Sequence, residues 1–342
     1  MILAIDVIVD AGYNRDMKIS DTLKVQYLDI PDDRIDQRLD NLLINLLKGV
    51  PKSRIYRLLR KGEIRVNKKR VKPDYRIQQD DVLRLPPIYL EPVIQKPLNP
   101  KLQKIQLLKS HIIEDQKNWM VLNKPSGIAV HGGSGLSFGV IEALRVLFPE
   151  LPYLELVHRI DRETSGVLLI AKRRSTLRFL HQQLREKTMK KTYLCMVHGK
   201  WPDKLTRIQT PIIKTSGRNG ERIMQTSDEG KASDTCFKVI ECSRHTSLLE
   251  VMPITGRTHQ IRVHCASAGY PILGDNKYRQ ESHLIENEKN NKVSRLMLHA
   301  LKLKFQPSSE DSKQMIQAPI DESFANIMSC YGFPAKLIGM FS

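Results

Sequence analysis

A proline-dense stretch divides this sequence into two parts. Residues 86–104 contain Pro86, Pro87, Pro92, Pro97 and Pro100. Because proline fixes φ and lacks a backbone N–H, this density prevents a regular helix or a central strand. We therefore predict an extended linker over 86–104. The chain of 342 residues is long enough for two domains, one on each side of the linker.

The part before the linker begins with two predicted helices. Apolar residues recur with helical spacing over 35–47, which is typical of an amphipathic helix. A second helix is expected from about Ser53, and its apolar positions are Ile55, Leu58 and Leu59. The stretches EIRVNKK and DDVLRLPP then read as two strands, the first of them alternating into a turn at Asn67.

Positive charge is concentrated in this part of the chain. The whole sequence has a net charge of +18, and residues 48–76 hold twelve Lys and Arg against Glu63 and Asp74. A solvated face is the ordinary explanation of a charge run, but so few counter-charges in one compact unit favour phosphate binding. The cations expected to bind RNA here are Lys52, Arg54, Arg57, Arg60, Lys61, Lys68, Lys69 and Arg70.

The paired helices, the KGEIRVNKKRV hairpin and the acidic turn before the last strand resemble the S4 RNA-binding domain over 34–85. The resemblance implies that the second helix and the hairpin face an RNA backbone. Residues 1–33 are expected to be an N-terminal extension with a lead-in strand. Met17 is a candidate for the true start, because residues 1–16 match nothing in the family named below.

The part after the linker is expected to form one α+β domain over 105–328, followed by a C-terminal tail over 329–342. Its first notable motif is HRIDRETSG, which precedes the apolar run VLLIA at 167–171. The run predicts a buried strand, so Asp161 lies on the loop that leads into the sheet, where catalytic groups are common. A structural ion pair is the alternative for Asp161, while the kinase HRD motif is excluded by Ile160 and by the lack of a DFG.

Three further motifs accompany the first. NKPSG at 123–127 indicates a turn beside a site or beside RNA, and KKTY places Tyr193 in a strand, where it is either a core residue or a platform for a base. In TGRTHQIR, two arginines flank a helix start, and each is either a surface cation or the partner of a carboxylate or phosphate. The candidates from the loop, turn and helix motifs are His158, Arg159, Thr164, Asn123, Lys124, Arg257 and Arg262.

Composition limits the other classes of function. The five cysteines are far apart and form no CxxC pair, which favours reduced thiols over disulfides or a zinc site. His259 and His264 are badly spaced for one metal, so we expect no metal and no cofactor. No apolar run approaches the ~20 residues of a membrane span, and Asp6 and Asp10 interrupt the apolar N-terminus. We expect a cytoplasmic protein without a membrane partner.

Taken in order, NKPSG, HRIDRETSG, KKTY and TGRTHQIRVH resemble the RluA-type pseudouridine synthases over about 112–306, in wording closest to the branch called ribosomal large subunit synthase C. The resemblance implies an α+β catalytic domain with a mixed, mainly antiparallel sheet flanked by helices. Ile160 replaces a commoner leucine, and the polar stretch 279–293 is not an obvious family feature.

The resemblance also implies the chemistry. It assigns Asp161 as the catalytic carboxylate, Arg262 as its cation and Tyr193 as the base platform. A carboxylate in a partly dry pocket needs a nearby cation to stay charged. The implied substrate is 23S ribosomal RNA at three separate uridines, or a large-subunit assembly intermediate, and a monomer is expected. The alternatives are a sister synthase with another rRNA or tRNA target, and a catalytically silent RNA-binding assembly factor.

Overall fold

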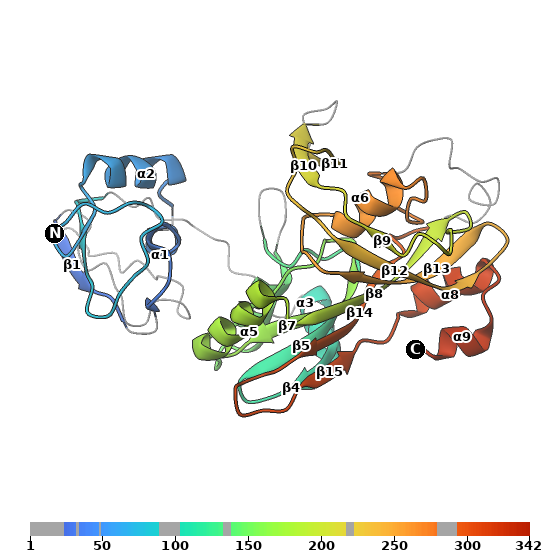
Figure 1. Cartoon of the computed structure of the whole chain (residues 1–342). Coiled ribbons are helices and arrows are strands. Elements are labelled where there is room, and N and C mark those ends of the chain that lie inside the picture. The colour runs from blue at the N-terminus through green and yellow to red at the C-terminus, as the bar shows by residue number, and fades with distance from the viewer. Residues whose placement is uncertain are drawn as a thin grey trace. The chain divides into compact units, whose positions relative to one another are not determined.

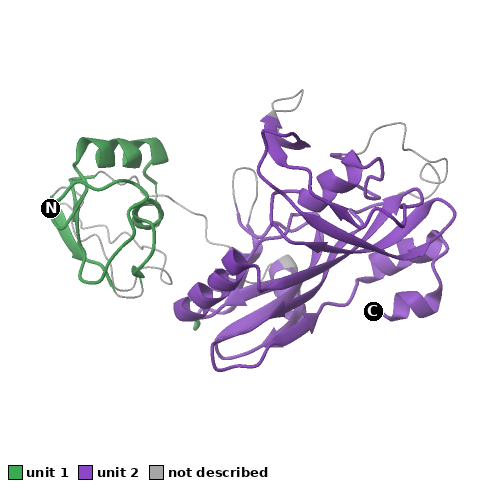
Figure 2. Cartoon of the chain, in the orientation of Figure 1, with its two compact units in different colours: residues 1–98, 150–153 green, residues 99–149, 154–342 purple. Residues whose placement is uncertain are grey.

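The chain forms two compact units in a computed structural model, residues 1–98 with 150–153 and residues 99–149 with 154–342 (Figure 2). The structure describes residues 24–31, 34–47, 49–88, 103–132, 138–216, 222–278 and 293–342. Residues 1–16 with the Met17 start, most of the expected linker and nearly all of the stretch 279–293 lie outside the described residues.

The first unit pairs two helices with a small antiparallel sheet in the order β1-β3-β2 (Figure 1). Its elements are β1 (Gln26–Asp29), α1 (Leu39–Leu46), α2 (Lys52–Lys61), β2 (Arg65–Val66) and β3 (Val82–Leu85). The predicted apolar face of the second helix is buried in the core of this unit. Gly62 ends α2 in the left-handed conformation at φ 69°, which glycine adopts without strain. Both predicted helices and both predicted strands are confirmed.

A buried carboxylate fixes the hairpin that follows α2. Asp81 is 2% exposed and accepts hydrogen bonds from the Asn67 amide and from the Gln78 backbone, both at 2.8 Å. Asn67 and Lys68 have positive φ angles of 49° and 64°, so the chain turns sharply at the predicted position. The exposed tip of this turn therefore presents Lys68, Lys69 and Arg70 to solvent.

The second unit is built on a ten-stranded sheet whose main path is β4-β5-β7-β14-β8-β13-β12-β9, with β15 beside β14 and β6 beside β7 (Figure 1). Among the strands that the structure describes, every pair is antiparallel except β7–β14, and the helices flank the sheet. The predicted mixed, mainly antiparallel α+β fold is confirmed. Its strands are β4 (Ile112–Asp115), β5 (Trp119–Lys124), β6 (Glu155–Leu156), β7 (Ser165–Ala171), β8 (Lys190–His198), β9 (Arg207–Ile208), β12 (Thr235–Cys242), β13 (Thr246–Pro253), β14 (Leu298–Phe305) and β15 (Gln314–Gln317), with a separate hairpin β10 (Ile212–Ser216) and β11 (Arg222–Thr226). Its helices are α3 (Gln103–Ser110), α4 (Val140–Leu147), α5 (Arg174–Glu186), α6 (Gln260–Ser267), α8 (Glu322–Cys330) and α9 (Ala335–Gly339).

Strand β7 is the buried strand that the apolar run predicted. All seven of its residues are buried, as expected for a strand covered on both faces. Its one parallel neighbour is β14, where Ser165 lies opposite His299. Gly166 has φ 108°, and a Cβ atom there would lie 2.2 Å from the Ala300 carbonyl oxygen, so the close approach of the two strands requires glycine.

The end of the chain belongs to the same core. Phe324 and Met328 on α8 are buried with Phe333 and Phe341, which lie after it. The Ile320 backbone donates to the Phe341 carbonyl at 2.8 Å and ties the last residues back to the strand region. Residues 329–342 therefore pack against the sheet. In the described ranges no helix is long and apolar enough to cross a membrane.

Candidate active site

Asp161 lies on the loop between β6 and β7, and hydrogen bonds hold this loop on both sides of Asp161. The Thr164 N–H donates to the Asp161 carbonyl at 3.2 Å and closes the turn. The Leu169 N–H donates to His158 Nε2 at 3.2 Å, so the imidazole of the HRIDRETSG motif is tied to the buried strand. Burial lowers the pKa of His158 to about 3, which keeps the ring neutral. The loop thus presents a carboxylate that is 21% exposed beside a rigid sheet.

Two side chains near the start of α6 face the carboxylate. Arg262 Nη1 lies 3.6 Å and His259 Nε2 lies 3.8 Å from the same oxygen, Asp161 Oδ2. Arg262 was predicted at this position, whereas His259 was considered only as a metal ligand and was assigned no role. Both are largely withdrawn from water, with side chains 8% and 19% exposed. The charge of Arg262 is therefore weakly screened at the carboxylate.

Arg262 is itself oriented by a second carboxylate. Its Nε and Nη2 atoms donate to Asp275 at 2.8 and 2.7 Å, and Asp275 is 1% exposed. The Tyr278 ring covers the guanidinium, with 5.1 Å between the guanidinium carbon and the ring centroid. The fork geometry of arginine fits such a bidentate contact, and only its third nitrogen is left for Asp161.

Asp161 opens into a cavity of about 460 Å³, a size that suits a small organic ligand. Tyr193 on β8 lies in its wall, and burial together with the charge of Asp161 raises the pKa of this phenol. Of the candidates from the four sequence motifs, the cavity is lined by Asp161, Arg262, Tyr193, His158, Arg159, Thr164 and Arg257. Segments more than 90 residues apart in sequence meet here, and the site joins three of the four motifs.

Lys191 also lines the cavity, and the sequence reasoning missed it. It stands two residues before Tyr193 on β8, so both side chains leave the same face of the strand. Burial lowers the pKa of Lys191. Its signal in the sequence was the second lysine of KKTY, which resembles any surface lysine until the strand is placed. Asp275 and His259 were also missed; His259 stands inside the TGRTHQIR motif, three residues before Arg262, and this was the signal that could have found it.

Asn123 and Lys124, predicted to bind RNA, have partners inside the protein and do not line the cavity. Lys124 is fully buried and donates to the carbonyl oxygens of Pro125, Ile128 and Arg162 at 2.7, 2.8 and 3.0 Å. Burial lowers its pKa to about 7, while the three carbonyl contacts favour the ammonium. Lys124 therefore ties the NKPSG turn to the loop that carries Asp161.

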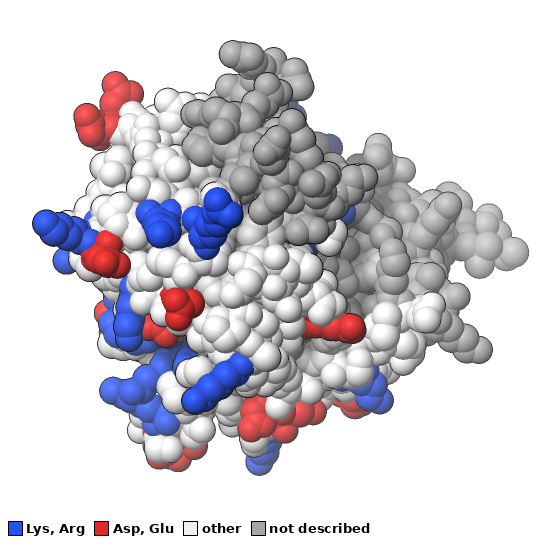
Figure 3. Space-filling view, turned by 90° about the vertical axis from the view of Figure 1, so that its right-hand side faces the viewer, with Lys and Arg blue, Asp and Glu red and all other residues white. Residues whose placement is uncertain are grey.

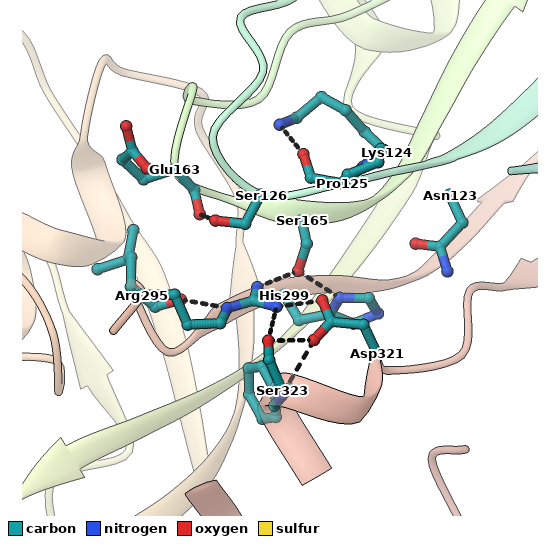
Figure 4. A network of polar contacts seen from close by, with 12 residues as sticks. Asn123, Lys124, Pro125, Ser126, Glu163, Ser165, Arg295, His299, Asp321 and Ser323 are labelled. Atoms are coloured by element: carbon teal, nitrogen blue, oxygen red, sulfur yellow. Dashed lines mark hydrogen bonds and ion pairs between the residues drawn. The ribbon is translucent and has the colours of Figure 1, made fainter. Parts of the chain in front are cut away.

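A polar network supports the other end of that loop (Figure 4). Arg295 Nη2 donates to Ser165 Oγ at 2.5 Å, and Ser165 Oγ lies 2.8 Å from His299 Nδ1. Arg295 also pairs with Asp321, the N-cap of α8, which accepts from the Phe324 N–H at 2.9 Å. Burial lowers the pKa of His299 to about 4. The network therefore joins β7, β14 and α8 four residues after Asp161.

No group of three or more His, Cys, Asp or Glu within the described ranges has an arrangement that could hold a metal ion. Arg159 and Arg257 are exposed at the cavity, and Arg257 Nε donates to the Ala232 carbonyl at 3.0 Å. The lining thus combines one carboxylate, a buried arginine, an aromatic ring and exposed cations. Such a set suits acid–base or nucleophilic chemistry on an anionic polymer.

Comparison with known proteins agrees with this arrangement. The family model described as RNA pseudouridylate synthase matches residues 118–267, and the S4 domain model matches residues 37–83. The chain belongs to the pseudouridine synthase family and is a pseudouridine synthase with an S4 domain in front, so the resemblance drawn from the motifs is confirmed.

Two relatives are similar over nearly their whole length. The chain is 50% identical over 305 residues to ribosomal large subunit pseudouridine synthase C of Haemophilus ducreyi, covering 89% of this chain and 95% of that one. It is also 50% identical over 304 residues to the protein of the same name from Escherichia coli, with the same coverage. A solved structure of human RNA pseudouridylate synthase domain containing 4 aligns with a TM-score of 0.56 at 24% identity, covering 67% of this chain and 95% of that one, which supports the fold.

Proposed function

We propose that this enzyme converts uridines of large-subunit ribosomal RNA to pseudouridine, with Asp161 as the catalytic carboxylate. The observation that carries the proposal is the ion pair of Asp161 with the buried Arg262, inside a cavity walled by Tyr193, in a chain of this family. The names of the two relatives support the choice of ribosomal RNA. Three separate target uridines in 23S RNA and a cytoplasmic place of action, which the resemblance of the motifs implies, are part of the proposal.

The reaction explains why one carboxylate suffices. The N1–C1′ bond breaks, the uracil ring turns and C5 joins C1′, while C5 loses its proton to solvent and N1 takes one up, so the composition of the nucleotide is unchanged. Attack of Asp161 on C1′ and removal of the C2′ proton both need an ionised carboxylate with an accessible oxygen. Arg262 brings a positive charge to within 3.6 Å of Asp161, and Asp275 orients Arg262.

Tyr193 is proposed as the platform for the target base. A uridine within folded RNA must leave its stack to reach a carboxylate inside a cavity, and an aromatic ring recovers part of the lost stacking energy. The position of Tyr193 two residues beyond Lys191 on one strand face supports this role. Arg159 and Arg257, exposed at the same cavity, are proposed to contact the RNA phosphates around the target.

The S4 unit is proposed to supply affinity. Lys52, Arg54, Arg57, Arg60 and Lys61 are all exposed on α2, and this helix contains no acidic residue. On the face of the chain that Figure 3 shows, by contrast, the described Lys and Arg residues are interspersed with Asp and Glu. Uncompensated cations on one helix favour a phosphate backbone over general solubility. We propose that the enzyme acts as a monomer. Its proposed parts are an S4 domain at 34–85, a linker at 86–104 and a catalytic domain at 105–328.

The test uses transcripts of large-subunit ribosomal RNA carrying tritium at C5 of uridine. Formation of the C5–C1′ bond displaces the hydrogen of C5, so each conversion releases tritium to water. We expect release with the wild-type chain and none with Asp161→Asn. Marking of pseudouridines by a base-specific reagent, followed by reverse transcription, then counts the sites. Failure to release tritium from any large-subunit transcript or assembly intermediate would refute the proposal.

A further inference from the structure

His259 is an unusual residue to begin a helix. It is the N-cap of α6, yet its side chain makes no capping hydrogen bond, although N-caps are chosen mostly for that bond. Its backbone has φ 55°, in the left-handed region that few side chains adopt. Such conformations persist where the surrounding structure enforces them and gather at functional sites. The side chain must therefore be needed elsewhere.

The contacts of Tyr278 fix the proton of this histidine. The Met224 backbone N–H donates to the Tyr278 hydroxyl at 3.2 Å, and the hydroxyl lies 2.6 Å from His259 Nδ1. Burial raises the pKa of Tyr278 to about 12, so the phenol keeps its proton and needs an acceptor. Among the described residues, the Tyr278 hydroxyl has these two contacts. The Met224 N–H is itself a donor, so only His259 Nδ1 can accept the proton of the hydroxyl. The neutral imidazole then carries its proton on Nε2, the nitrogen that faces Asp161.

The charges around His259 agree with a neutral ring. Burial lowers the pKa of His259, and the cations Arg262 and Lys277 act in the same direction, while Asp161 and Asp275 oppose them. At 3.8 Å the Nε2–H group acts on Asp161 through its dipole rather than through a formed hydrogen bond. In a partly dry pocket such a dipole still stabilises a carboxylate.

Both donors approach one carboxylate oxygen. Arg262 and His259 face Asp161 Oδ2. Within the described residues, no side chain or backbone group forms an ion pair or hydrogen bond with Oδ1. We infer that His259 is a positioning residue: with its tautomer set by Tyr278, it holds Oδ2 together with Arg262 and leaves Oδ1 as the oxygen that reacts with the nucleotide. This inference rests on the proposed catalytic role of Asp161.

The first arm of the test reads the tautomer directly. Nitrogen NMR of the full chain with ¹⁵N-labelled histidine distinguishes the two neutral tautomers and the imidazolium, and the signal of His259 is the one lost in His259→Asn. We expect the neutral form with hydrogen on Nε2 at pH 7.5, and loss of that preference in Tyr278→Phe. A hydrogen on Nδ1, or an imidazolium, overturns the inference. This arm needs no turnover, so it stands even if the proposed ribosomal RNA substrate is wrong.

The second arm measures single-turnover rates with saturating enzyme. Asparagine tolerates positive φ but loses the distal donor, whereas glutamine places an N–H group near the position of Nε2. We expect His259→Asn to slow conversion roughly 10- to 100-fold, as for loss of one electrostatic donor, and His259→Gln to recover most of that loss. RNA affinity and melting temperature should stay at their wild-type values in the glutamine variant.

A double-variant comparison separates positioning from a structural role. Tyr278→Phe should slow conversion in the wild-type background but add nothing in His259→Gln, because glutamine has no tautomer to fix. The matched control is Tyr270→Phe. Tyr270 packs on Trp201 and does not line the cavity, so this variant should leave the rate unchanged. Equal rates for His259→Asn and the wild type, in a chain that is active on ribosomal RNA, overturn the inference while leaving the proposed function intact.

Discussion

Arg262 gives two hydrogen bonds to Asp275, at 2.8 and 2.7 Å, and approaches Asp161 with its remaining nitrogen at 3.6 Å. From the sequence, Arg262 was expected to be the cationic partner of Asp161. The structure assigns the bidentate contact of Arg262 to a buried acid thirteen residues further along. Asp275 therefore orients the guanidinium, and the positive charge of Arg262 lies beside Asp161, the catalytic candidate.

Asp275→Asn should disorder Arg262 and slow catalysis. The change leaves a buried guanidinium without its counter-charge, and breaking a buried pair in this way costs about 3–5 kcal/mol of folding stability. We expect single-turnover conversion to fall roughly 10- to 100-fold, as when a group that orients a catalytic residue is removed, with little change in RNA affinity. Thermal melting and single-turnover kinetics on the same preparation measure both effects.

Two variants provide controls for this result. Asp234 accepts from Arg207 with the same bidentate geometry, at 2.9 and 2.6 Å, but Arg207 is 53% exposed. Asp234→Asn should therefore lower stability much less and leave conversion unchanged. Arg257→Met should weaken RNA binding while conversion at saturation persists. If Asp275→Asn behaved like Asp234→Asn, the orienting role of Asp275 would be wrong.

Asp161→Asn should abolish conversion while RNA binding survives. The amide has the shape of the carboxylate but neither its charge nor its nucleophilicity, and we expect a rate below roughly a thousandth of wild type. Tritium release measures the rate, and filter binding of the same transcript measures affinity. Residual conversion well above that level would show that another group carries the chemistry.

Neutralising α2 should change the salt dependence of RNA binding. Arg54, Arg57 and Arg60 are exposed on this helix, and each phosphate contact contributes about 0.7–0.9 to the slope of log K against log salt. The triple glutamine variant should flatten that slope by roughly 2 to 3, as should deletion of residues 1–95 to at least the same extent.

The matched control removes the same charge elsewhere. Lys304, Lys313 and Lys336 are exposed on the catalytic unit, near the end of the chain. Their triple glutamine variant should leave most of the slope in place. An equal flattening by both triple variants would mean that the S4 unit has no special part in binding.

Acid should destabilise the chain through His299. The Arg295 N–H occupies Ser165 Oγ, so the serine proton goes to His299 Nδ1, and Nε2–H donates to the Ala318 carbonyl at 3.0 Å. Burial lowers the pKa of His299 from 6.5 to about 4. The unfolded chain therefore binds more protons between these values, and stability is lost as the pH falls below 6.5, by up to about 3 kcal/mol near pH 4.

Urea unfolding across this pH range isolates the effect of that residue. His299→Gln keeps a donor for the Ala318 carbonyl but has no proton to gain. The free energy of unfolding should fall less steeply between pH 6.5 and 4 in the variant than in the wild type, with the two curves parallel above pH 7. Identical slopes below pH 6.5 would exclude His299 as the titrating group.

Local periodicity was enough to predict much of the fold. The helix faces of the S4 unit and the strand that begins at Ser165 depend on burial patterns that are visible in short windows of sequence. The proline-rich stretch likewise predicted two parts. The parallel contact between β7 and β14 was beyond this reasoning, because it joins residues more than a hundred positions apart and leaves only Gly166 as a local trace.

The candidate site likewise contains some residues that the sequence predicted and others that only the structure revealed. Asp161, Tyr193 and Arg262 stand in motifs and do line one cavity. Lys124 stands in a motif as well, but its ammonium is used by three carbonyl groups of the protein. Lys191 and His259 also stand in motifs, but only the structure shows that they line the cavity, and only the structure shows that Asp275 pairs with Arg262. The motifs thus supplied the candidate carboxylate, its cation and an aromatic wall, whereas the contacts that orient Arg262 came from the structure.

The bond between Ser165 and His299 spans 134 residues, and Arg295 is anchored in turn at Asp321. The loop that carries Asp161 is therefore braced by the last part of the chain to be made. During translation, a nascent chain that has already exposed its S4 unit can bind RNA phosphates long before its catalytic loop is supported. With the proposed roles, RNA binding would precede catalysis during synthesis, and we expect incomplete chains to occupy ribosomal RNA without modifying it.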